Sequence, residues 1–192
     1  MAETKAERST AAGDPPEAAP KPKRISKRKR VEAHCRSYFE ALNRRDVRAI
    51  GEHWREDGVA DIAPVGIFRG RAEIMDFFAG IFAGAPDMET TVTRVVAGDR
   101  SAAVEWRMEG TFEGETFQGI DPTGGRLDLR GLDLLEIEDD QIVSNTAYYD
   151  GMAFARQVGM MPAQDSGAER ALKGAFNAVT RARRAVSERT AS

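Results

Sequence analysis

The feature that most constrains this chain is the regular alternation of apolar and polar residues in its second half. Across residues 101–112 the apolar side chains fall at every second position: Ala102, Val104, Trp106 and Met108. A period of two residues is typical of a β-strand with one buried face. Residues 88–97 are also β-rich, and residues 126–138 and 141–149 predict a hairpin that turns at Asp139 and Asp140. These patterns predict a long antiparallel sheet.

The first half of the chain shows helical periodicity instead. One apolar stripe repeats at i, i+4, i+7, i+8 and i+11, formed by Val31, Cys35, Tyr38, Phe39 and Leu42. A second helix is predicted to begin at the cap Asp46, to bury Trp54 on its inner face and to end at residues 57–58. A short extended segment follows at residues 62–65, where Pro64 interrupts it.

A third predicted helix begins at Gly70 and stops at residues 85–87. Three helices followed by a long antiparallel sheet predict an α+β fold with the helices against one sheet face. After the sheet, a short helix is predicted up to residue 158 and a final helix over residues 168–188.

The charges divide the 192-residue chain into three parts, although the net charge is only −3. Residues 1–20 contain no large hydrophobe after Met1, and Lys21–Arg30 carries seven positive charges and no negative charge. We therefore expect residues 1–30 to be a disordered basic arm, because such a segment cannot bury enough apolar surface to offset chain entropy. The folded domain is predicted over residues 31–162, and residues 163–192 are predicted to be a linker and a basic amphipathic helix.

The two basic ends raise the question of partners. The arm Lys21–Arg30 could bind nucleic acid, but no aromatic residue is interleaved for base stacking. Residues 31–168 are acidic, with 13 positive and 25 negative side chains. The pattern favours a solubilising tail, or a tail that lies on this acidic part, over nucleic-acid binding. The narrow apolar stripe of the last helix contains a single aromatic residue, Phe176, so we expect that helix to dock on the domain or on a second subunit rather than on a membrane.

Several classes of protein are excluded by composition. One cysteine cannot form an internal disulfide, and the longest apolar stretch, residues 77–85, is far short of a membrane span. The first 30 residues contain no secretory hydrophobic run, so a cytoplasmic location is expected. His34 and His53 form no recognised metal-ligand spacing, and no phosphate-binding glycine motif is present. We expect no metal and no cofactor.

One residue, Asp133, breaks the pattern of the predicted strand 126–138. Simple alternation places Asp133 on the same face as Leu129, Leu135 and Ile137. A carboxylate among hydrophobes must be hydrogen-bonded, paired or raised in pKa, and a carboxyl with a raised pKa suits proton transfer.

The alternative for Asp133 is a β-bulge at Gly131, which would shift the register of the strand. Asp133 would then share a face with Asp128 and Arg130 and form a surface ion pair.

The residues around this strand resemble the SnoaL-like polyketide cyclase family over about residues 31–162. The resemblance is carried in order by the segments YFEALN (38–43), FRGR (68–71), FQGIDPTG (117–124), LRGLD (129–133), YYD (148–150) and FARQVG (154–159). It implies the cone-shaped fold of the nuclear transport factor 2 superfamily, in which a curved antiparallel sheet surrounds a pocket and three N-terminal helices close it. The C-terminal helix is an addition to this fold.

The resemblance also implies a cofactor-independent enzyme that acts on a hydrophobic oxygenated small molecule. The family's aspartate acts as acid and base in an intramolecular aldol cyclisation, and this role carries over to Asp133. Related isomerase or hydrolase chemistry fits the same superfamily, and so does a non-catalytic module that binds a small molecule or a protein. Some members use a histidine on the strand region before the aspartate, whereas His34 and His53 lie in the helical part of this chain. Pairing through the outer sheet face is usual in the superfamily, so a homodimer is expected.

Seven further side chains are candidates for ligand binding, each with a simpler role as an alternative: Tyr38, His53, Trp54, Trp106, Phe112, Phe117 and Tyr149. The tryptophans and phenylalanines could line the pocket or belong to the ordinary core. The Tyr38 hydroxyl could orient a ligand carbonyl or bind the backbone, and His53 could be a base in the cavity or an exposed helical residue. Tyr148 and Tyr149 point to opposite faces of their strand, so at most one of them faces the pocket.

Overall fold

The computed structural model describes residues 26–190, which form five helices and six strands. The helices are α1 (Lys27–Asn43), α2 (Val47–His53), α3 (Arg71–Gly84), α4 (Gly151–Gln157) and α5 (Gly167–Thr190). The strands are β1 (Trp54–Ala63), β2 (Gly66–Arg69), β3 (Glu89–Ala97), β4 (Ser101–Phe112), β5 (Gly125–Glu138) and β6 (Gln141–Tyr149). The long strands expected from alternation are present, and β4 and β6 have the predicted bounds.

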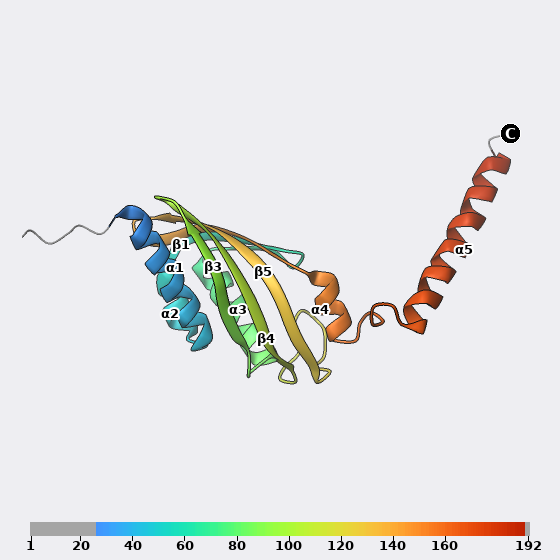
Figure 1. Cartoon of the computed structure of the whole chain (residues 1–192), viewed down its shortest axis with the longest axis horizontal. Coiled ribbons are helices and arrows are strands. Elements are labelled where there is room, and N and C mark those ends of the chain that lie inside the picture. The colour runs from blue at the N-terminus through green and yellow to red at the C-terminus, as the bar shows by residue number, and fades with distance from the viewer. Residues whose placement is uncertain (1–25, 191–192) are drawn as a thin grey trace, which may run out of the picture.

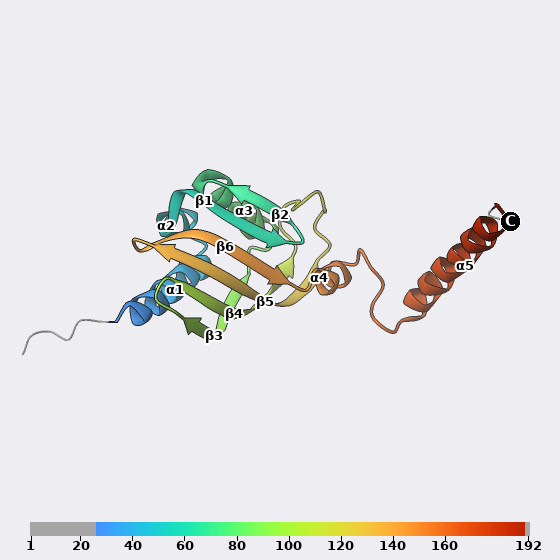
Figure 2. The ribbon, with the colours of Figure 1, turned by 90° about the horizontal axis from the view of Figure 1, so that it is seen from above.

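All six strands join one curved, open sheet in the order β2-β1-β6-β5-β4-β3 (Figure 2). The neighbouring strands are antiparallel except for β1 and β6, which are parallel. The four long strands predicted from the sequence, β3–β6, pair antiparallel with one another as expected, and the expectation of an antiparallel sheet is wrong only where β1 joins β6. The parallel pair forms where β1, which precedes the other long strands in the sequence, joins the sheet beside β6.

The helices α1, α2 and α3 gather on one face of the curved sheet (Figure 1). Helix α1 packs on β3 and β4, and α3 packs on β1 and β2, so an apolar core forms between helices and sheet. The α+β layering predicted from the sequence is confirmed, and the inner face of the sheet is the one that these helices cover.

Helix α1 begins at Lys27, four residues before the expected domain boundary, so Lys27–Arg30 is helical rather than disordered. Ser26 caps this helix by accepting a hydrogen bond from the backbone N–H of Lys29. The rest of the expected arm, residues 1–25, lies outside the described residues. The predicted apolar stripe of α1 is buried along its length.

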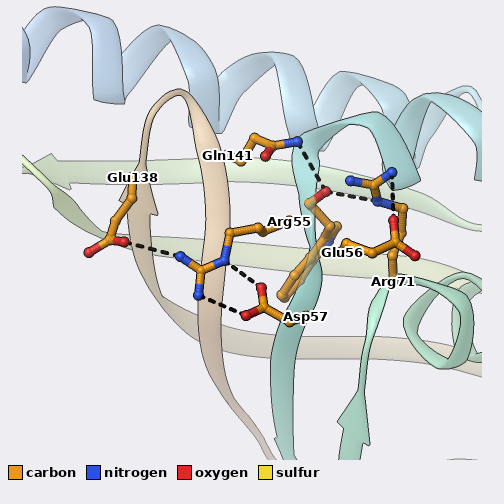
Figure 3. Close-up of polar contacts among 7 residues, drawn as sticks. Arg55, Glu56, Asp57, Arg71, Glu138 and Gln141 are labelled. Atoms are coloured by element: carbon orange, nitrogen blue, oxygen red, sulfur yellow. Dashed lines mark hydrogen bonds and ion pairs between the residues drawn. The ribbon is translucent and has the colours of Figure 1, made fainter.

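The second helix is shorter than predicted, because α2 ends at His53 and Trp54 is already the first residue of β1. The Trp54 carbonyl accepts hydrogen bonds from the Arg71 guanidinium and the Gln141 side chain (Figure 3). Arg55, which follows Trp54, pairs with Glu138 at 3.1 Å across the sheet. The spacing of four residues between Ile50 and Trp54 fits a helix, so the sequence pattern predicted that the helix continues. The contacts that make Trp54 the start of a strand come from residues distant in the sequence.

Helix α5 extends away from the rest of the molecule (Figure 1), so the expected docking on its own domain is wrong. At its first turn, the buried Glu169 accepts hydrogen bonds from Arg156 and from the backbone N–H of Asp165. The apolar stripe of α5 is exposed, and 70% of the Phe176 surface is accessible. Docking on a second subunit stays a prediction. None of the described helices is both long and apolar enough to span a membrane.

Candidate functional site

The strand β5 runs through the site without a bulge at Gly131. Its pairing with β4 is continuous from Gly125 to Glu136, and the first irregularity toward β6 lies between Glu136 and Ile137. The alternative register is therefore wrong, and Asp133 lies on the inner face with the buried Leu135.

Gly131 is required for a different reason, which is the close approach of an aromatic ring. Trp106 lies directly opposite Gly131 on β4, and a Cβ atom at position 131 would lie 2.1 Å from Trp106 Cζ2. Because Gly131 has no side chain, the indole can lie flat over β5 and reach the next inward-facing residue, Asp133.

The inner face forms a partly open cavity of about 130 Å³. Its wall is formed by side chains of α1, β1, α3, the long strands β3–β6 and α4, together with Phe117 from the loop after β4. Nearly all of these side chains are apolar. The polar members are Thr90, Asp133, Asn145 and Tyr149, with the indole N–H of Trp106. A cavity of this kind accommodates a ring-sized apolar ligand and orients it through few polar groups.

Asp133 is 6% exposed and accepts two hydrogen bonds, one on each carboxyl oxygen. Trp106 Nε1 donates to Oδ1 at 2.8 Å, and Asn145 Nδ2 donates to Oδ2 at 2.9 Å. Both donors are neutral, and Asp133 has no ion-pair partner within residues 26–190. The carboxyl group is thus held in position without being neutralised.

Burial raises the pKa of Asp133 to about 6, although the hydrogen bonds from Trp106 and Asn145 pull it down. Loss of water disfavours the charged form, and two neutral donors return only part of that cost. A carboxyl that titrates near pH 6 exists in both protonation states close to neutrality, as a group that takes up and returns a proton must.

Four of the seven candidate ligand residues line the cavity: Trp106, Phe112, Phe117 and Tyr149. Tyr149 faces inward while Tyr148 is exposed on the opposite face, as their alternation predicts. Burial raises the pKa of Tyr149, so its hydroxyl stays protonated near neutral pH.

The other three candidates, Tyr38, His53 and Trp54, lie outside the cavity lining that the structure describes. Tyr38 and Trp54 are fully buried, and the Trp54 side chain lies close enough to the Tyr38 hydroxyl to lower the pKa of Tyr38. Burial raises the pKa of Tyr38, and the charge of Asp133 raises it further. Tyr38 is therefore a neutral neighbour of Asp133 and is not placed to contact a ligand in the cavity.

His53 is half-buried rather than exposed and faces His34, with His53 Nδ1 at 3.4 Å from His34 Nε2. Burial, followed by the neighbouring His34, lowers the pKa of His53 to about 4, and burial also lowers the pKa of His34. Both rings are neutral at pH 7 and join α1 to α2 away from the cavity. Within the part of the chain that the structure describes, no cluster of three or more His, Cys, Asp or Glu side chains could hold a metal ion.

Asn145 is the residue that sequence reasoning missed. It lies on β6 with its side chain 2% exposed, in the inward series with Ala147 and Tyr149. A single amide among inward-facing positions was the available signal, but its significance depends on the neighbouring strand, which brings it to Asp133.

Comparisons with known proteins identify the family and the fold of the chain. The family model described as the SnoaL-like domain matches residues 35–145. The search of curated proteins gives no match.

Many solved structures share the fold, at low sequence identity. A protein described as a SnoaL-like polyketide cyclase from Jannaschia sp. CCS1 is 19% identical, with a TM-score of 0.65 over 74% of this chain and 100% of that chain. AclR from Streptomyces galilaeus, described as a hydroxylase, is 20% identical, with a TM-score of 0.64 over 81% of this chain and 98% of that chain.

A third structure, from Catenulispora acidiphila, has a ketosteroid isomerase-like fold and was solved in complex with trimethylamine. It is 19% identical, with a TM-score of 0.56 over 66% of this chain and 92% of that chain. These likenesses establish the fold, while the family model covers more than half of the chain. The chain therefore belongs to the SnoaL-like family.

Proposed function

We propose that this protein is an acid-base enzyme of the SnoaL-like kind, independent of cofactors, that acts on a hydrophobic oxygenated small molecule. The observation that carries the proposal is Asp133, a buried carboxyl without a countercharge in an apolar cavity, with its pKa raised to about 6. This combination is unfavourable for folding, since an apolar residue there would stabilise the domain more. It is what proton transfer requires.

In the proposed reaction, ionised Asp133 removes a proton from a carbon next to a ligand carbonyl. The C–H electron pair moves into the carbonyl and leaves an enolate, and the proton resides on the carboxyl group. In an aldol cyclisation the enolate carbon then attacks a second carbonyl of the same ligand, and Asp133 returns its proton to the new alkoxide. In an isomerisation the proton returns to a different carbon. Both reactions use one carboxyl group, which suits a cavity with a single acidic side chain.

Apolar surroundings support this chemistry, because they exclude water and strengthen the interaction of the carboxyl with the reacting atoms. The cavity volume of about 130 Å³ suits one ring of a ligand, with the remainder of a larger molecule extending through the mouth. Among the structural neighbours, the Catenulispora acidiphila protein is described in complex with a small molecule, trimethylamine.

The test is exchange of α-hydrogens of small ketones such as 1-indanone for deuterium in D₂O, followed by ¹H NMR. We expect the wild-type protein to accelerate exchange and Asp133→Asn to lose about 100-fold or more of that acceleration, the usual contribution of a general base. Asp128→Asn is the matched control, because Asp128 lies on the same strand but on the outer face. Equal rates for wild type and Asp133→Asn would contradict the proposal.

A non-catalytic binding module is the second candidate, favoured by the position of both histidines outside the described cavity lining. A binder would retain affinity for the same ketones in wild type and Asp133→Asn but would accelerate exchange in neither. The exchange measurement therefore separates the two functions.

We further propose a homodimer that forms through the outer face of the sheet. Leu132, Leu134 and Tyr148 are exposed there, and Leu132 lies directly opposite Tyr148 across β5 and β6. Exposed apolar patches of this kind mark interaction surfaces. Light scattering after size-exclusion chromatography should give twice the chain mass, and Leu134→Lys should give the monomer mass. The exposed stripe of α5 could add to the same contact.

A further inference from the structure

Among the residues that line the cavity, one buried side-chain atom has no hydrogen-bond partner within residues 26–190. Asn145 donates from Nδ2 to Asp133, but its Oδ1 is buried and receives no hydrogen bond from residues 26–190. Because a buried acceptor without a hydrogen bond is unfavourable, such an atom is normally paired with a donor. Asn145 is among the residues that line the cavity, although its Oδ1 is itself inaccessible, so a bound molecule would supply the missing donor only with a small rotation of the amide.

The orientation of this amide is fixed from the other end of a hydrogen-bond chain. The indole N–H of Trp106 can only donate, so Asp133 Oδ1 must accept from it. An ionised carboxylate can only accept, so Asn145 must present Nδ2 to Asp133 Oδ2 and its Oδ1 is left over. Each partner in the series Trp106–Asp133–Asn145 determines the polarity of the next one.

From this series of hydrogen bonds we infer that the cavity selects ligands with a hydroxyl or N–H donor beside the atom that exchanges a proton with Asp133. Asn145 Oδ1 accepts a hydrogen bond from that donor. The inference rests on the proposed function, since it names the ligand class of the same cavity. Enolic and phenolic compounds belong to this class. A ligand that offers only a carbonyl leaves Asn145 Oδ1 unpaired.

The same series of hydrogen bonds predicts that the preference for donor ligands becomes a preference for acceptor ligands when the side chain at position 133 is neutral. With Asn at position 133, Oδ1 still faces the Trp106 N–H, so Nδ2 must donate toward Asn145. The Asn145 amide then turns its Oδ1 to position 133 and its Nδ2 into the cavity. The cavity now presents a donor and favours a ligand carbonyl. The side chain at position 133 keeps one hydrogen bond with Trp106 and one with Asn145 in this arrangement, so Asp133→Asn should fold.

The experiment uses two neutral compounds of the same skeleton, 2-naphthol as donor and 2-tetralone as acceptor, with affinities from isothermal titration calorimetry at pH 7.5. We expect the wild-type protein to bind 2-naphthol about tenfold or more tightly than 2-tetralone, because the polar group of the site is paired by one compound only. Asp133→Asn should bind 2-tetralone more tightly. In Asp133→Asn combined with Trp106→Phe the donor that fixes the chain is gone, and the reversed preference should disappear.

A second measurement does not depend on the folding of any variant. The wild-type preference should also reverse between pH 7.5 and pH 5, because Asp133 becomes protonated. Cys35 and Tyr38 behind Asp133, and Tyr149 in the cavity, have pKa values raised by burial and stay neutral over this range.

The outcomes separate this inference from the proposed function. If wild type binds both compounds with equal affinity, or if Asp133→Asn and pH 5 leave the preference for 2-naphthol unchanged, the inference is wrong and the cavity remains a ligand site. If wild type binds neither compound, both the inference and the proposed cavity function fail.

Discussion

The two faces of strand β5 shift the pKa of an aspartate in opposite directions. On the outer face, Asp128 accepts two hydrogen bonds of 2.7 Å from the Arg107 guanidinium, and these bonds hold its pKa below the ordinary range. On the inner face, Asp133 accepts two hydrogen bonds from neutral donors, and burial raises its pKa to about 6. Five positions along one strand separate the two carboxyls.

Both carboxyls accept two hydrogen bonds, so the presence or absence of a countercharge, rather than the number of hydrogen bonds, separates their chemistry. Asp128 has a cation and water, so it stays ionised and stabilises the surface modestly. Asp133 has no cation beside it and little contact with water, so its ionised form is unfavourable. Both its protonated and its ionised form are therefore populated near pH 6. The inner face gives up stability at Asp133, and this loss is consistent with selection for a reaction rather than for packing.

The largest expected effect on stability is at Asp133. Its folded pKa is raised from 3.8 to about 6, so wild type is most stable, relative to Asp133→Asn, below the unfolded pKa and loses that stability as the pH rises through 6. From below the unfolded pKa to above pH 6, we expect the stability of wild type relative to Asp133→Asn to fall by up to about 3 kcal/mol, the free energy of two pKa units. Urea unfolding from pH 4 to 8 measures this difference; a constant difference across the range would contradict it.

The next effect concerns Gly131, which gives the Trp106 ring its place. We expect Gly131→Ala to destabilise the domain by about 1–3 kcal/mol, because the new methyl group overlaps the indole and forces it to move. Ala at Gly119, where a Cβ atom would meet nothing within 4 Å but the φ angle is 75°, is a control for backbone strain without ring displacement. Thermal unfolding compares the two variants, and the account of Gly131 fails if Gly131→Ala unfolds at the wild-type temperature.

A smaller effect is predicted for Trp106→Phe, which keeps an aromatic ring but removes the N–H that Asp133 accepts. Since that hydrogen bond lowers the pKa of Asp133, its loss should move the pKa above 6. The acid limb of the pH profile for ketone exchange should therefore shift to higher pH in this variant. A limb that stays in place would show that the indole N–H does not act on the carboxyl.

The smallest effect is predicted on the outer face. Asp128→Asn should be slightly less stable than wild type at neutral pH, and the difference should vanish as the pH falls below the ordinary aspartate pKa, where the folded carboxyl also becomes protonated. High salt should also diminish it, because the pair is exposed. The pH trends of Asp128→Asn and Asp133→Asn thus have opposite signs, and trends of the same sign would remove the distinction between the faces.

The sequence predicts those parts of this molecule that depend on local periodicity. Alternation located β4 and β6 and placed Asp133 on the inner face. It could not locate the start of β1, because Trp54 also continues the helical stripe of Ile50 and only contacts with Arg71 and Gln141 distinguish the two.

The residues of the candidate site could likewise be predicted only in part from the sequence. The presence of a carboxyl on the apolar face was visible in one strand, but its two donors come from the strands on either side. Gly131 suggested a bulge, whereas a glycine is needed there because the Trp106 ring of β4 occupies the space of a Cβ atom. That ring belongs to another strand, so the sequence of β5 alone could not reveal it. Contacts across strands decide which inward-facing residues act together, and no period along one strand records them.

The most direct measurement is the pKa of the two carboxyls in one protein, by ¹³C NMR titration of the Asp133 and Asp128 side chains from pH 2.5 to 8. The inner carboxyl should titrate near pH 6 and the outer one below the ordinary aspartate value. An Asp133 pKa at or below that ordinary value would contradict a proton-exchanging carboxyl in the cavity.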